Sequence, residues 1–112
     1  MSALAGAIGG LAGAWAMDRV QTGLERFEPN VDRELDERVA ARLGIPPAAI
    51  HYAVGAGAGA VYGILPRRFQ ADGFLFGAAV WAVSAAVWRT NRASLAAHLV
   101  YGAVTGGVAR LV

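Results

Sequence analysis

The order of hydrophobic and polar positions divides the chain into four apolar stretches and one polar insert. The apolar stretches predict helices over residues about 3–22, 48–65, 72–89 and 94–112. Apolar stretches of about 16 to 20 residues are typical of helices that cross a lipid bilayer. These four also lack the recurring polar stripe that a water-facing helix carries. We therefore predict an all-α fold: a bundle of four transmembrane helices, forming a single integral membrane domain over residues 1–112.

The polar insert predicts a short amphipathic helix over residues about 31–43, between the first two apolar helices. Asn30 can cap its start, Gly44 follows its last turn, and Pro46-Pro47 block its continuation. Its apolar residues recur four apart on one face, at Val31, Leu35, Val39 and Leu43. Such a helix is expected to lie flat on the membrane surface or to fold under the mouth of the bundle.

Composition supports the membrane interpretation and narrows the chemistry. Hydrophobic residues make up 56% of the chain and charged residues only 16%, against about 25% charged in an ordinary soluble domain. Two alternatives compete with it: a cleaved signal peptide ending near the "AWA" of residues 14–16, and a soluble Gly/Ala-rich bundle. The absence of Cys excludes disulfides and thiolate metal sites. No basic cluster exceeds Arg67-Arg68, so we expect no nucleic-acid partner.

Glycine recurs at intervals of three to four residues along three of the apolar stretches. In a bilayer, small residues at that spacing let helix backbones approach closely. The sequence therefore predicts a helix-packing role for Gly6, Gly10, Gly13, Gly55, Gly59, Gly63, Gly102 and Gly106. No glycine-rich loop opens a helix after a strand, which argues against a nucleotide site.

The two histidines each begin a glycine-rich segment, "HYAVGAGAGAVYG" from His51 and "HLVYGAVTGG" from His98. Antiparallel connections bring His51, His98 and Asp18 to a similar depth at one membrane face, with Asn91 nearby. An ionisable residue in a membrane helix indicates function. We expect a proton, ion or ligand cluster of Asp18, His51, His98 and Asn91.

Three other roles for these residues stay open at this point. The side chains could simply form hydrogen bonds between helices. The two histidines could be axial ligands of a haem b. Both histidines with Asp18 could instead bind a divalent metal ion, whose ligand types suit iron or zinc.

Several segments together resemble the YagU-like family of small bacterial inner-membrane proteins. They are "LAGAIGGLAGAWAMDRVQ", the spacing from His51 to Tyr62, the closing Pro66, "DGFLFGAAVWAV", and a last helix that opens with "HLV". The resemblance covers all four apolar stretches, and the loops depart from it by being short. It implies a multi-pass protein of the bacterial inner membrane, with His51 and His98 at family-type positions, and it implies no mechanism.

Two classes of function follow. The first is a small binding or transport protein that handles a proton, ion or small ligand. The second is a structural or accessory subunit that packs through its glycine faces. The lipid bilayer is the expected partner in both, together with a homo-oligomer or a larger membrane complex. No Ser/His/Asp order or HExxH-type spacing supports hydrolysis, so an enzyme is not favoured.

Overall fold

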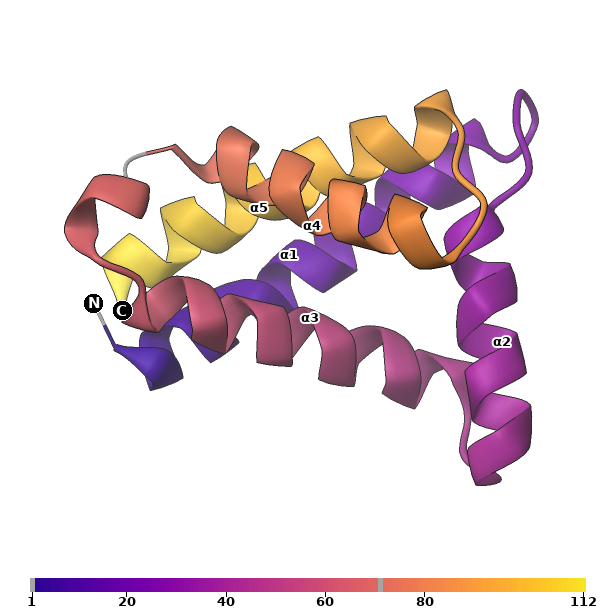
Figure 1. Ribbon diagram of the computed structural model, residues 1–112, viewed down its shortest axis with the longest axis horizontal. Helices are drawn as coiled ribbons and strands as arrows, with labels where there is room; N and C mark the ends of the chain where they lie inside the picture. Colours follow the sequence, from indigo (N-terminus) through magenta and orange to yellow (C-terminus); the bar gives the residue numbers. More distant parts are fainter. Residues whose placement is uncertain (1, 71) are drawn as a thin grey trace.

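The computed structural model describes residues 2–70 and 72–112, which form helices joined by short connections (Figure 1). The elements are α1 (Ala3–Leu24), α2 (Val31–Leu43), α3 (Pro47–Ile64), the 3-10 turn η1 (Arg67–Phe69), α4 (Gly73–Val87) and α5 (Arg92–Leu111). The predicted all-α class is confirmed, and five α-helices lie close to the predicted ranges. The largest differences are of two residues: α1 ends later, α4 ends earlier and α5 begins earlier than predicted.

The helix ends follow from local sequence. In four helices a side-chain oxygen accepts a hydrogen bond from a backbone N–H of the first turn. These caps are Ser2, Asn30, Asp72 and Asn91. α3 begins instead with Pro47, whose fixed φ suits a first helical position. α2 ends at Gly44, where φ is 69°, a left-handed conformation that glycine adopts without strain.

α1 is the central helix of the bundle. α3 and α5 pack on two sides of it, and α4 packs on α5, so that the helices follow one another in the order α3, α1, α5, α4. α2 packs against α3 and runs across one end of the bundle, whereas both chain termini lie at the other end (Figure 1).

Glycines face each other where these helices meet. On α1, Gly6 and Gly10 lie against Gly59 and Gly55 of α3, and a Cβ added at Gly59 would overlap the Gly6 carbonyl oxygen. At the seam between α4 and α5, a Cβ on Gly77 would reach within 3.2 Å of the Gly102 Cα. All eight glycines predicted to pack helices lie at such contacts, whereas Gly57 on the outer side of α3 has nothing within 4 Å.

Gln70 closes the end of the bundle opposite α2. Its side-chain Nε2 donates to the carbonyl oxygens of Tyr62, Gly63 and Leu65, at 3.0, 3.1 and 2.7 Å. Its backbone carbonyl accepts from the Tyr62 hydroxyl at 2.6 Å and from Arg110 Nη2 at 2.7 Å. Gln70, through its side-chain amide and its backbone carbonyl, therefore joins the C-terminal end of α3 to the C-terminal end of α5.

The prediction of four transmembrane helices is not supported by the described structure. None of the helices within residues 2–70 and 72–112 is both long enough and apolar enough to cross a membrane. The predicted span over residues 72–89 is a helix of 15 residues, because the backbone becomes extended at Trp88.

Buried and exposed positions differ in side-chain size. The interior is built mainly from small residues and includes Ala5, Ala14, Ala97 and Ala109 beside the glycines. Large apolar side chains lie outside, and Leu4, Val83 and Val87 are each at least 70% exposed. The bundle therefore has a small-residue interior and an apolar exterior.

Candidate ligand-binding cavity

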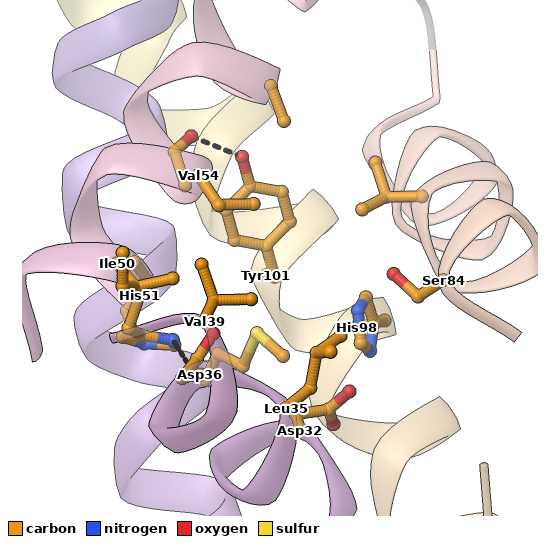
Figure 2. Close-up of a pocket in the computed structure, with 15 residues that line it drawn as sticks. Asp32, Leu35, Asp36, Val39, Ile50, His51, Val54, Ser84, His98 and Tyr101 are labelled. Atoms are coloured by element: carbon orange, nitrogen blue, oxygen red, sulfur yellow. Dashed lines mark hydrogen bonds and ion pairs between the residues drawn. The ribbon is translucent and has the colours of Figure 1, made fainter. Parts of the chain in front are cut away.

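A cavity of about 190 Å³ lies between α2 and the rest of the bundle (Figure 2). All five α-helices contribute to its wall. Its larger apolar side chains are Met17, Leu35, Val39, Ile50, Val54 and Val80. Its polar side chains are Asp32, Asp36, His51, Ser84, His98 and Tyr101. The wall is thus mostly apolar, with a few polar groups converging on it, as in small-molecule sites generally.

His51 faces Asp36 on one side of the cavity. Its Nε2 lies 2.8 Å from the Ala14 carbonyl oxygen, and its Nδ1 lies 3.7 Å from Asp36 Oδ2. A carbonyl only accepts, so Nε2 carries a hydrogen. Nδ1 faces the Asp36 carboxylate, so in the neutral ring the Nδ1 lone pair and the carboxylate repel each other. A second hydrogen, on Nδ1, replaces this repulsion with an ion pair. This arrangement favours the positively charged imidazolium.

His98 lies on the opposite side of the cavity, beside Ser84 in Figure 2. It is only 4% exposed, and its Nδ1 lies 2.8 Å from the Ser94 carbonyl oxygen one turn earlier in α5. Since that carbonyl only accepts, Nδ1 is the donor. The two histidines therefore have different surroundings, with a carboxylate partner at His51 and a backbone partner at His98.

Two further groups complete the polar lining. Asp32 Oδ2 accepts from the amide of the buried Gln21 at 2.5 Å. The Tyr101 hydroxyl donates to the Gly55 carbonyl oxygen at 2.5 Å, which ties α5 to α3. The hydrogen bond of the Tyr101 hydroxyl lies in the wall of the cavity (Figure 2).

The structure separates the four residues predicted to form one polar cluster. His51 and His98 line the same cavity, whereas Asp18 and Asn91 do not. Asp18 lies 3.8 Å from Arg33 and borders a neighbouring hollow that it shares with His51. Asn91 caps α5 and donates to the Pro29 carbonyl oxygen at 2.8 Å. Asp36, which was not predicted to belong to the cluster, lies beside His51, where Asp18 was expected.

The described residues do not fit a metal site or a haem site. In residues 2–70 and 72–112, no three His, Asp or Glu side chains are grouped closely enough to hold a metal ion. A volume of about 190 Å³ is also smaller than the roughly 300–1,000 Å³ of pockets that hold drug-sized ligands. The haem and metal interpretations are therefore not supported by the described residues.

The polar groups of the cavity include a serine and a histidine, a pair that nucleophilic catalysis can use. Ser84 and His98 line the cavity from neighbouring helices, yet no hydrogen bond joins them within the described structure. A nucleophile and its base lie within hydrogen-bonding reach of each other, and a third group orients the base. Here the Nδ1 of His98 is used by the Ser94 carbonyl.

α2 is held over the cavity by residues far away in the sequence. Trp88 Nε1 donates to the Val31 carbonyl oxygen at 2.8 Å, and Arg89 forms an ion pair with Glu34. Glu28 accepts from the backbone N–H of Ala93 at 2.8 Å. These contacts span more than 50 positions, so no local pattern in the sequence could reveal them.

The Glu28 carboxylate also acts as a cap for α5. It accepts from the Ala93 N–H at the start of that helix and lies 3.0 Å from Arg92 Nε. The backbone hydrogen bond from Ala93, together with Arg92, lowers the pKa of Glu28 below its ordinary value of 4.5. The connection between α1 and α2 is thereby tied to α5 by a charged group.

No protein-family model, curated protein or solved structure matches the chain at a significant level. The resemblance to the YagU-like family stays a prediction.

Proposed function

We propose that the protein is a small membrane-embedded helical bundle that binds a small ligand in the cavity beneath α2. The observation that carries this proposal is the cavity itself, in which two imidazoles and two carboxylates converge on an otherwise apolar wall. Side chains of that kind are uncommon inside proteins unless they are paired or functional. Binding rather than catalysis is the activity that the group geometry supports.

The exterior supports the membrane part of the proposal. α3 and α4 carry no Asp, Glu, Lys or Arg between their first and last residues. Val61 and Ile64 on α3 and Leu75 and Val83 on α4 are all more than half exposed. Contiguous apolar surface of this kind is unfavourable in water and favourable against lipid chains. The lipid bilayer is thus the environment that best fits the outer faces.

The inward positions explain why α1, α3 and α5 each have modest hydropathy when taken alone. Glycines, His51 and His98 count in the average over a helix, but the glycines lie at helix contacts and both histidines face the cavity. Lipid contacts only the outer side chains. A bundle of such helices presents more apolar surface than the helix averages indicate.

The cavity can be tested with two variants of one helix. Val80→Phe adds a ring to the cavity wall, whereas Val83→Phe adds the same ring on the 70% exposed face of α4. Met17 lines the cavity, and the only other methionine is residue 1, so ¹³C-methyl labelling provides one reporter in the wall. The measurement is titration of the purified protein in lipid nanodiscs with short alcohols and amines.

We expect a saturable shift of the Met17 methyl signal in the unmodified protein and in Val83→Phe. Val80→Phe should abolish the saturable shift, because its ring enters the cavity of about 190 Å³ that a ligand would otherwise fill. A Met17 signal that never shifts, or that shifts equally in both variants, would overturn ligand binding at this site.

A further inference from the structure

The Nε2 atom of His98 is an acceptor without a partner. Because Nδ1 is the donor to Ser94, the neutral ring carries its lone pair on Nε2. Within residues 2–70 and 72–112 no group forms a hydrogen bond with that atom. The residue is nevertheless 96% buried, given its 4% exposure, and it lines the cavity. The atom is open to the cavity, so a donor that enters the cavity can satisfy it.

The charges around the cavity are unbalanced. Its lining contains two carboxylates, Asp32 and Asp36, and no arginine, and the chain contains no lysine. Asp36 has His51 as a partner that carries a positive charge when it is protonated. Asp32 is half-buried, its hydrogen-bond partner is the neutral amide of Gln21, and no arginine faces it in the cavity wall. A carboxylate in mostly apolar surroundings is stabilised by a cation.

Arg33, the nearest arginine on α2, does not supply that cation. Its guanidinium lies 2.5 Å from Glu25 and 3.8 Å from Asp18, and it does not line the cavity. A cation bound in the cavity can supply the positive charge that Asp32 lacks.

We propose that the cavity binds a small organic cation, namely an ammonium group on a short alkyl chain. Its N–H groups are donors to His98 Nε2, to the Asp32 carboxylate and to the Ser84 hydroxyl, and its alkyl chain packs on apolar residues such as Val54 and Val80. This inference rests on the proposed function and names the class of ligand. A volume of about 190 Å³ is the space of roughly six water molecules, which limits the alkyl chain to a few carbons.

The position of these acceptors supports one common recognition site. Figure 2 shows Asp32, Ser84 and His98 on the same side of the cavity, and the paired His51 and Asp36 on the other. They come from α2, α4 and α5, so the site is complete only when α2 lies over the bundle. An ammonium ion, with three N–H donors, can satisfy three acceptors at once.

The test compares butylamine with 1-butanol, two molecules of nearly equal size. Butylamine is a cation at pH 7, as a lysine side chain is. Both are titrated into the unmodified protein, and the Met17 methyl signal is recorded. We expect butylammonium to bind at least about tenfold more tightly than butanol, because only the cation neutralises Asp32.

Two variants assign the preference to the named groups. Asp32→Asn keeps an oxygen acceptor for Gln21 but removes the charge, and should weaken amine binding about tenfold while leaving butanol binding unchanged. His98→Asn keeps a side-chain N–H near Ser94 but removes Nε2, and should weaken amine binding several-fold. Asp18→Asn, outside the cavity, is the matched control and should change neither.

The outcomes separate this inference from the proposed function. If butanol shifts Met17 saturably and butylamine binds no better, the cavity binds ligands but has no preference for a cation. The same conclusion follows if Asp32→Asn leaves the amine affinity unchanged. If neither molecule shifts the Met17 signal, the proposed function fails together with this inference.

Discussion

The seam between α1 and α3 and the end of the bundle beneath α2 show two ways of joining the same helices. Along the seam, Gly6 and Gly10 meet Gly55 and Gly59 so closely that no side chain fits between the backbones. Beneath α2, polar side chains such as His51 and Asp36 make the contacts in the wall of a cavity. One region leaves no free space, and the other leaves about 190 Å³.

The difference follows from residue size along each helix. On α3 the glycines begin at Gly55, one turn after His51, so the contact with α1 tightens away from the α2 end. On α5, His98 and Tyr101 come before Gly102 and Gly106 in the same way. Both helices therefore carry larger side chains at the end that α2 covers. The cavity lies at that end.

The largest expected effect comes from a methyl group placed in the seam. Gly59→Ala would bring a Cβ within 2.7 Å of the Gly10 Cα and should lower the free energy of unfolding by roughly 2–3 kcal/mol, because neither backbone can move away without loss of packing. Gly57→Ala on the same helix has nothing within 4 Å. It should raise stability by up to about 1 kcal/mol through helix propensity.

Chemical unfolding in detergent micelles, followed by circular dichroism, measures both of these variants. Equal effects of Gly57→Ala and Gly59→Ala would contradict the view that close backbone contact limits the α1–α3 seam.

An intermediate effect is expected where the seam meets the cavity. Tyr101→Phe removes the hydroxyl that donates to the Gly55 carbonyl oxygen at 2.5 Å. The loss should cost roughly 1 kcal/mol of unfolding free energy, the typical net value of one hydrogen bond. Tyr52→Phe is the matched control, since no hydrogen bond engages its hydroxyl within the described structure. If the two substitutions cost the same, the bond to Gly55 does not help to hold α5 against α3.

The smallest effect is expected at the attachment of α2, and it depends on pH. The pKa of Glu28 is lowered in the folded protein, so its contribution to stability is present above the ordinary value of 4.5. That contribution is lost as the pH falls below 4.5 and through the folded pKa. The Ala93 amide proton, which donates to Glu28, should shift in an NMR titration with a midpoint below 4.5.

Two variants check the assignment of this titration. Glu28→Gln should abolish the acid-dependent shift of the Ala93 amide, and Glu37→Gln, on the exposed side of α2, should leave it in place. A midpoint above 4.5, or a shift that survives in Glu28→Gln, would show that another group holds this connection.

Much of the fold could be predicted from local patterns. The caps at Asn30 and Gly44 bound α2 as predicted, because each acts through its own side chain or backbone conformation. The glycines at four-residue spacing lie at helix contacts, because such residues share one face of a helix. The prediction of membrane-spanning helices is not supported, because no helix of the described residues is both long enough and apolar enough to cross a membrane.

The candidate site was predicted only in part. Helix order placed His51 and His98 at the same end, and both line the cavity. The carboxylate beside His51 was assigned to Asp18, yet it belongs to Asp36, because α2 folds back over the bundle. Spacing along the chain cannot show that fold, since the contacts that hold α2 come from Trp88, Arg89 and Ala93.

The sequence by itself therefore determined the helices, their small-residue faces and the end at which the histidines lie. These properties depend on neighbours within a few residues, where propensity and spacing act directly. Only the tertiary structure decided that Asp32 and Asp36 line a cavity with His98. That juxtaposition depends on the packing of five helices, in which α2 folds over the end of the bundle that carries the larger side chains.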